Sequence, residues 1–184
     1  MRLLGLVFCL YAGLCFAGPE PSPEMVFPDL EGIARRPLEP ADKAASVLVF
    51  YWQDCPICNS YAPELNRIAA SHTNFAFYIV QVDPQLTTAL AREHAQAFNL
   101  HLPVLLDPQH RLVNQVHATT TPEAVVMGKN GRILYRGRID NGYPRLGKKR
   151  VVVTEHDLID SLDAITAGKL SKAVETTPVG CLIQ

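Results

Sequence analysis

The amino-acid sequence predicts a three-layer α/β domain with a central mixed β-sheet. Two nearly continuous apolar runs of strand length, residues 46–53 and 75–83, are each followed by a helical pattern. This alternation is typical of parallel strands with helices on the faces of the sheet. A turn sequence between two β-rich runs, residues 123–128 and 133–140, then predicts an antiparallel hairpin. A closing helical pattern completes one domain of ordinary size in a chain of 184 residues.

The first two helices follow from hydrophobic spacing. Apolar residues recur at nearly helical spacing within residues 58–72, and Pro63 predicts a kink rather than an end because the pattern continues beyond it. The second helix is expected to open at Pro84, with Leu86, Leu90 and Ala97 on one face.

The second half of the chain is marked by turn and capping residues. A short strand at 102–107 and a short helix at 111–118 are expected to form an insertion before the hairpin. Residues 129–131, Lys-Asn-Gly, predict the hairpin turn. The last helix is expected to open at Thr154 and to end at Gly168.

The N-terminal segment predicts export to the periplasm or secretion. Arg2 precedes an apolar stretch, residues 3–16, that is short for a membrane span, and small residues favour cleavage after Ala17. An uncleaved anchor is the alternative; after cleavage we expect no membrane span. The expected organisation is a signal peptide (1–17), a Pro-rich linker (18–25), the α/β domain (26–168) and a C-terminal tail (169–184).

The net charge and the cysteine content limit the range of possible functions. With a formal net charge of −1, the chain lacks the basic surface that nucleic-acid binding requires. We also expect a monomer that needs no cofactor. Signal cleavage would remove Cys9 and Cys15 and leave three cysteines: Cys55, Cys58 and Cys181. A domain of this size folds without a disulfide, so these thiols are expected to serve chemistry.

The segment Cys55-Pro-Ile-Cys58 lies where the first strand gives way to the first helix. A helix N-terminus favours a thiolate, so Cys55 is expected to be the exposed nucleophile, although neighbouring Asp54 should raise its pKa. Cys58, one turn further along, is placed to resolve a mixed disulfide. This predicts thiol–disulfide exchange.

Two other readings of the same motif remain open. Cys55 could attack a peroxide, or the two thiolates could hold Cu(I) in a protein that is not an enzyme. No second Cys-x-x-Cys pair exists, and none of the six histidines stands at metal-ligand spacing beside a cysteine, so we expect no metal site.

Two stretches, VFYWQDCPIC…YAPEL and TTTPEAVVMGKNGRILYRGRID, resemble the thioredoxin-like superfamily. The similarity is greatest to its redoxin branch, which includes alkyl hydroperoxide reductase/thiol-specific antioxidant-like domains and exported thiol–disulfide oxidoreductases, and it spans about residues 25–167. The resemblance implies a thioredoxin-like α/β/α fold and an antioxidant or disulfide-exchange activity. It also implies that Thr121 and a cis Pro122 face the dithiol and bind substrate together with Trp52 and Pro56.

The chain departs from the family pattern at the positions that handle protons and peroxide. The buried acid expected six residues before the first cysteine is Val49, and the glutamate that some exported reductases carry six residues after it is Tyr61. The Pro and Thr that precede a peroxidatic cysteine are replaced by Leu48 and Trp52. The first two departures leave Cys58 without its usual proton acceptors, and the last two count against a peroxidase.

We therefore expect an exported thiol–disulfide oxidoreductase with Cys55 as nucleophile and Cys58 as resolving thiol. Its partners would be protein thiols or disulfides, or an electron-donating redox protein. Cys181 follows Gly180 in an extended C-terminal tail. It is either a small buried residue or a third redox thiol, and the glycine would permit its close approach.

Overall fold

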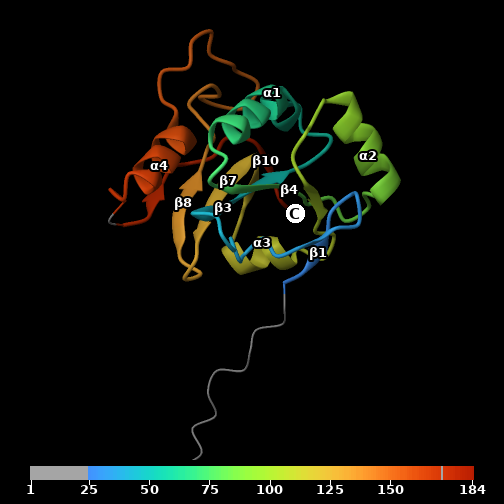
Figure 1. Cartoon of the computed structure of the whole chain (residues 1–184). Coiled ribbons are helices and arrows are strands. Elements are labelled where there is room, and N and C mark those ends of the chain that lie inside the picture. The colour runs from blue at the N-terminus through green and yellow to red at the C-terminus, as the bar shows by residue number, and fades with distance from the viewer. Residues whose placement is uncertain (1–24, 171) are drawn as a thin grey trace, which may run out of the picture.

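The computed structural model describes residues 25–170 and 172–184 (Figure 1). The expected signal peptide and most of the linker lie outside the described residues. The helices are α1 (Pro56–Ser71), α2 (Thr88–Ala97), α3 (Arg111–Val116) and α4 (Asp157–Thr166). The strands are β1 (Phe27–Pro28), β2 (Ala34–Arg35), β3 (Ala45–Tyr51), β4 (Ala76–Gln81), β5 (Val104–Leu106), β6 (Thr120–Thr121), β7 (Glu123–Gly128), β8 (Ile133–Gly137), β9 (Val174–Glu175) and β10 (Cys181–Leu182).

A mixed six-stranded sheet in the order β5-β4-β3-β7-β8-β9 forms the centre of the molecule. β3 pairs in parallel with β4, where Val49 lies opposite Ile79, and antiparallel with β7, where Val49 lies opposite Ala124. β7 and β8 form the predicted antiparallel hairpin. The mixed sheet expected from the sequence is therefore confirmed.

The two faces of the sheet pack against different helices. All seven residues of β3 are buried, and its side chains alternate between the faces. Val47 and Val49 contribute to a cluster with α1 and α4, whereas Leu48 and Phe50 pack with α3 on the opposite face. Figure 1 shows α1 and α3 on opposite sides of the sheet. The expected α/β/α layering is confirmed.

Two helices begin later than expected because their predicted first residues have other roles. Pro84 lies in a turn, and α2 starts after Thr87, whose hydroxyl accepts a hydrogen bond from the Leu90 N–H at 3.3 Å. Leu90 is 47% exposed and Ala97 is also exposed, so neither lies on the buried face. Thr154 exchanges two hydrogen bonds with the Asn141 side chain, and α4 starts only at Asp157.

Two segments are more closely joined to the sheet than the sequence indicated. β5, expected in an insertion, is the edge strand of the central sheet beside β4. In the C-terminal segment, β9 adds a parallel strand beside β8, and β10 pairs with β6 at the cysteine motif. Within the described part of the chain, no helix has the length and apolar character needed to cross a membrane.

Candidate active site

Cys55 is the residue that caps the N-terminus of α1. The chain leaves β3 at Tyr51 and turns so that the Cys55 N–H donates to the Trp52 carbonyl at 3.0 Å. Pro56 occupies the first turn of α1, where its missing N–H costs nothing. The helix then continues through Pro63 to Ser71, so the prediction that this proline does not end it is confirmed.

Thr121, the last residue of β6, and Pro122, which links β6 to β7, face the cysteine motif. Their peptide bond is cis, as the resemblance implied. The Cys55 thiol sulfur lies 3.5 Å from the Thr121 carbonyl oxygen, and the Thr121 side chain donates to the Cys181 carbonyl at 3.3 Å. This Thr-Pro pair thus touches both the motif and the C-terminal strand.

Cys181 is brought to the motif by the C-terminal segment. β10 pairs antiparallel with β6, with Cys181 opposite Thr121, and the sulfurs of Cys181 and Cys55 are 2.7 Å apart. A Cβ on Gly180 would lie 1.9 Å from the Thr121 carbonyl oxygen, so only glycine allows this approach. The close approach expected from Gly180 is confirmed.

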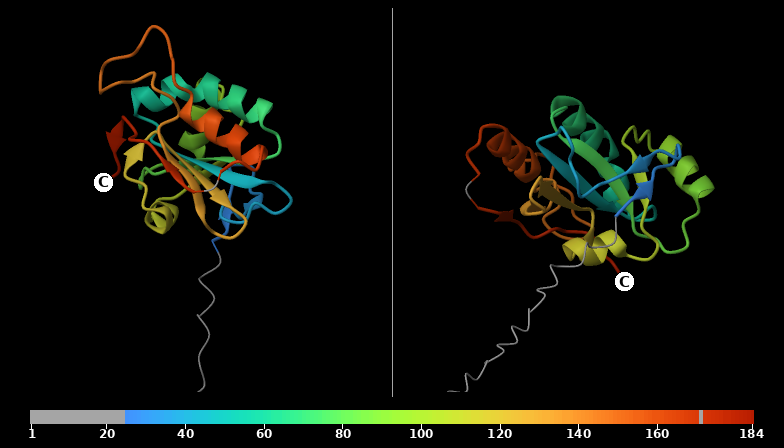
Figure 2. Two further views of the ribbon diagram at one scale, coloured as in Figure 1. Left: turned by 90° about the vertical axis from the view of Figure 1, so that its left-hand side faces the viewer. Right: turned by 60° about the horizontal axis from the view of Figure 1, so that its bottom comes forward.

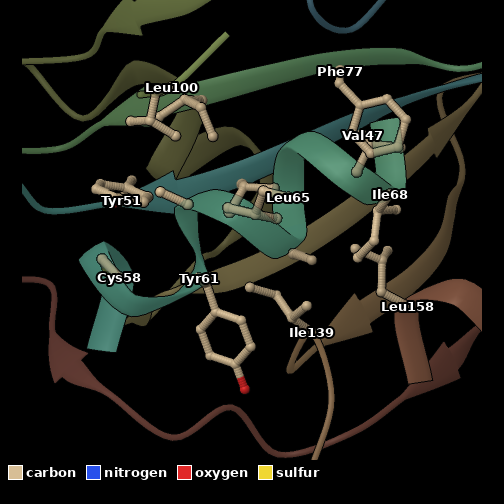
Figure 3. Close-up of a cluster of buried hydrophobic side chains, with 14 of the residues drawn as sticks. Val47, Tyr51, Cys58, Tyr61, Leu65, Ile68, Phe77, Leu100, Ile139 and Leu158 are labelled. Carbon is tan, nitrogen blue, oxygen red and sulfur yellow. The ribbon is translucent and has the colours of Figure 1, made fainter. Parts of the chain in front are cut away.

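The expectation that Cys55 is the exposed thiol is wrong for this arrangement. Cys55 and Cys58 are both 0% exposed, whereas Cys181 is partly exposed. β10 pairs with β6, which contains Thr121, and this pairing places the Cys181 sulfur against the Cys55 sulfur. Cys58 belongs to the same buried cluster as Tyr51 and Leu65 (Figure 3).

The three thiols have very different acidities. A hydrogen bond from the Cys58 thiol, supported by one from Cys181 and by backbone N–H groups of α1, lowers the pKa of Cys55 to about 5 although burial opposes this. Burial and the neighbouring Cys55 raise the pKa of Cys58 well above its usual value. The same two causes raise the pKa of Cys181 to about 11.

The raising effect expected from Asp54 does not decide the pKa of Cys55, which is lowered. The sulfur receives hydrogen bonds from thiols and from the N-terminal backbone of the helix, and these stabilise the anion directly. Asp54 lies on the exposed side of the turn and is not among the groups that set this pKa.

The other residues expected to bind substrate lie around the motif. Trp52 is half-buried and lines a hollow of about 140 Å³ together with Ile183 and Gln184 of the C-terminal segment. Pro56 is exposed on the first turn of α1. The structure thus places Trp52 against the C-terminal segment and Pro56 at the surface.

Sequence reasoning missed the residue that supports the cis-proline loop. Glu123 is 2% exposed, and its carboxylate accepts hydrogen bonds from the N–H groups of Thr119 and Thr120 at 2.8 and 3.2 Å. Arg136 on β8 approaches the same carboxylate at 3.9 Å. The signal available in the sequence was an acidic residue directly after the Thr-Pro pair. A carboxylate buried at that position requires hydrogen-bond donors or a cation beside it.

A second polar group near the two cysteines of the motif was also missed. The Tyr51 hydroxyl donates to the side-chain oxygen of Asn59 at 3.0 Å, and a ring nitrogen of His94 lies 2.9 Å from the same oxygen. Tyr61, which replaces the family glutamate, donates instead to buried Asp140. Among residues 25–170 and 172–184, no group of three or more His, Cys, Asp or Glu side chains could hold a metal ion.

Comparison with known proteins identifies the family. The model of the AhpC/TSA family matches residues 20–136, and the chain belongs to this family of thioredoxin-like redoxins. No match was found among curated proteins.

Solved structures show the same fold. A hypothetical protein of Sinorhizobium meliloti 1021 has a TM-score of 0.73 at 24% identity, covering 86% of this chain and 88% of that one. An uncharacterized conserved protein of Geobacillus kaustophilus has a TM-score of 0.75 at 20% identity, covering 90% of each chain. A secreted Mycobacterium tuberculosis disulfide oxidoreductase, described as homologous to Escherichia coli DsbE, has a TM-score of 0.56 at 18% identity, covering 77% and 96%. The thioredoxin-like fold is confirmed, and fold and family together support a redox function.

Proposed function

We propose that this protein is a thiol–disulfide oxidoreductase that works through the Cys55–Cys58 pair. The observation that carries the proposal is the contrast in acidity between two adjacent thiols. Cys55 has a pKa of about 5, and Cys58 beside it has a pKa raised far above the usual value. At neutral pH, one sulfur is a nucleophile and the other holds a proton.

This contrast gives each cysteine a separate step. The Cys55 thiolate attacks one sulfur of a partner disulfide, and the partner's other sulfur leaves as a thiolate and takes a proton. Cys58 then loses its proton and attacks the Cys55 sulfur of the mixed disulfide, releasing the partner as a dithiol. The protein gains a Cys55–Cys58 disulfide, and two electrons pass to the partner. The reverse sequence oxidises a partner dithiol.

Four residues would hold the partner segment beside the sulfur. Thr121, next to cis Pro122, lies on an edge with which an extended chain can pair, as β10 does in the structure, so a partner segment would take the place of β10 there. Trp52 and the exposed ring of Pro56 would add apolar contact on either side of Cys55. The partners would be protein thiols or disulfides, or a redox protein that donates electrons.

Export is part of the same proposal. The N-terminal residues have the pattern of a signal peptide, and one structural relative is described as secreted. A periplasmic or secreted location would place the dithiol where disulfides form and persist. We propose a monomer that needs no cofactor for the exchange.

The test is equilibration of the full chain with mixtures of reduced and oxidised glutathione, followed by alkylation and peptide mapping. We expect a Cys55–Cys58 disulfide whose fraction follows the glutathione ratio, and reduction of a protein disulfide by the reduced chain. Cys55→Ser and Cys58→Ser should each abolish turnover. A wild-type chain that never forms the Cys55–Cys58 disulfide would overturn the proposal.

Membership of the AhpC/TSA family favours peroxide reduction as a second candidate. A thiolate at Cys55 is the first requirement of that reaction, because the thiolate attacks the peroxide and becomes a sulfenic acid. Trp52 stands where the family's peroxide-activating threonine is expected. Consumption of hydrogen peroxide at the expense of a dithiol reductant, lost in Cys55→Ser, would select this candidate.

A further inference from the structure

The C-terminal strand occupies the backbone edge that a partner segment would use. β10 pairs antiparallel with β6, with Cys181 opposite Thr121 and Leu182 opposite Thr120, and the Ile183 N–H donates to the Thr119 carbonyl at 3.0 Å. Figure 2 (left) shows this strand, in red, beside the yellow β6. An extended segment added to a free edge is a common mode of peptide recognition, here made by the chain's own end.

Two close contacts through glycine hold the C-terminal segment in this position. A Cβ on Gly137 would lie 2.1 Å from the Thr176 hydroxyl oxygen, and the Thr176 N–H donates to the Arg136 carbonyl at 2.9 Å. Gly180 then lies directly against the Thr121 carbonyl. Residues 177–179 connect these two contacts, so the tether is short and Cys181 has little freedom to leave Cys55.

The position of the sulfurs makes Cys181 the outward-facing thiol of the site. Its sulfur is 2.7 Å from that of Cys55, whereas a disulfide needs about 2.05 Å. Cys55 and Cys58 are both 0% exposed, and Cys181 is partly exposed. A molecule that approaches from solvent therefore meets the Cys181 sulfur first.

We propose that Cys181 is a third reacting thiol, through which the buried Cys55–Cys58 pair exchanges with external thiols. This rests on the proposed function. In the oxidised protein, Cys181 gives its proton to solvent and its sulfur attacks the Cys55 sulfur. The Cys55–Cys58 bond breaks, and Cys58 leaves as a thiolate and takes up a proton. One disulfide is exchanged for another, with no net oxidation.

The external step follows from the new Cys55–Cys181 disulfide. A thiolate of a protein dithiol attacks the partly exposed Cys181 sulfur, and Cys55 leaves as a thiolate; its low pKa makes it a good leaving group. The partner's second thiol then attacks the mixed disulfide and frees Cys181. The partner is oxidised by two electrons and this protein is reduced by two. In the reverse direction the same steps reduce a partner disulfide.

The first experiment traps the internal exchange in the full chain. Cys58→Ser is treated with oxidised glutathione, quenched with acid and digested with trypsin. We expect the peptide beginning at Ala173 to be disulfide-linked to the peptide that carries Cys55. Cys58→Ala is the second variant in case a hydroxyl is not tolerated in the core. The control is Cys58→Ser/Cys181→Ser, which should give a Cys55–glutathione adduct instead. The same adduct in Cys58→Ser, with Cys181 free, would overturn the proposal.

The second experiment measures whether disulfide exchange with external thiols passes through Cys181. The Cys55–Cys58 disulfide of the wild type and of Cys181→Ser is reduced with glutathione, and the rate is followed by alkylation. We expect Cys181→Ser to slow reduction by about tenfold or more, because the serine still covers the site but cannot react. Equal or faster reduction would overturn the proposal.

Failure of this inference is distinguishable from failure of the proposed function. If the wild type forms and exchanges a Cys55–Cys58 disulfide while Cys181 never links to Cys55, only the third thiol is refuted. If no Cys55–Cys58 disulfide forms in the wild type, the proposed function itself is refuted.

Discussion

The low pKa of Cys55 makes a quantitative prediction for the pH dependence of the reduction potential. Forming two neutral thiols from a disulfide takes up two protons, and the potential of such a couple falls by about 59 mV per pH unit. Above a pKa of about 5 the reduced protein carries Cys55 as a thiolate, while Cys58 and Cys181 keep their protons. Only one proton is then taken up, and the slope should be about 30 mV per pH unit.

The size of the effect follows from the distance between this pKa and neutral pH. Two pH units separate about 5 from neutrality, so the potential at pH 7 should lie about 60 mV above that of the same couple without ionisation. Cys181→Ala removes one of the hydrogen bonds to the thiolate, and a hydrogen bond to a charged group contributes about 1.5–3 kcal/mol. In this variant, the pH at which the slope of the reduction potential changes should therefore rise by about 1 to 2 units.

The assay is equilibration of the full chain with glutathione mixtures of known potential between about pH 4 and about pH 8. Samples are quenched with acid, alkylated and analysed by peptide mapping. Cys181→Ser is the matched variant, because its hydroxyl can still donate to the thiolate and should keep the change of slope near pH 5. A slope of about 59 mV per unit throughout this range would refute the argument, because Cys55 would then be a neutral thiol.

Three further outcomes are expected. Gly180→Ala should displace β10, because the added Cβ meets the Thr121 carbonyl oxygen, and should speed alkylation of Cys55 by iodoacetamide at least several-fold. Gly128→Ala is the control and should not, because a Cβ there meets only the flexible end of a side chain at 3.2 Å. The reduced protein should lose stability in urea as the pH falls from about 8.5 through about 5, because the folded pKa of Cys55 lies below its unfolded value; an undiminished loss in Cys55→Ser would contradict this. Tyr61→Phe should lower the free energy of unfolding by about 1–3 kcal/mol, measured by urea denaturation, because buried Asp140 loses a donor; an unchanged midpoint would contradict it.

Much of the fold could be predicted from local patterns in the sequence. The apolar run of β3 predicted a strand buried on both faces, and the Lys-Asn-Gly turn joins β7 to β8 as expected. The Cys-Pro-Ile-Cys segment directly after β3 placed Cys55 at the start of α1. Each of these features depends on neighbouring residues, so hydrophobic period and turn chemistry are sufficient to find it.

Helix starts were less predictable because they depend on competing hydrogen bonds. Pro84 and Thr154 both have the character of a first helical residue. The chain instead caps α2 with Thr87 and pairs Thr154 with Asn141, a residue distant in sequence from α4. The sequence does not show which of several capable partners a polar side chain will meet.

The sequence by itself determined the thioredoxin-like layers, the dithiol at the start of α1 and the Thr-Pro pair opposite it. Only the tertiary structure decided which thiol faces solvent and how acidic Cys55 is. Solvent access depends on Cys181, which is separated from Cys55 by 126 positions and reaches it through β10 and Gly180. The acidity depends first on the hydrogen bond from Cys58 and then on the one from Cys181. Burial and hydrogen bonding are properties of groups brought together in space, and no local pattern near Cys55 records the strand that covers it.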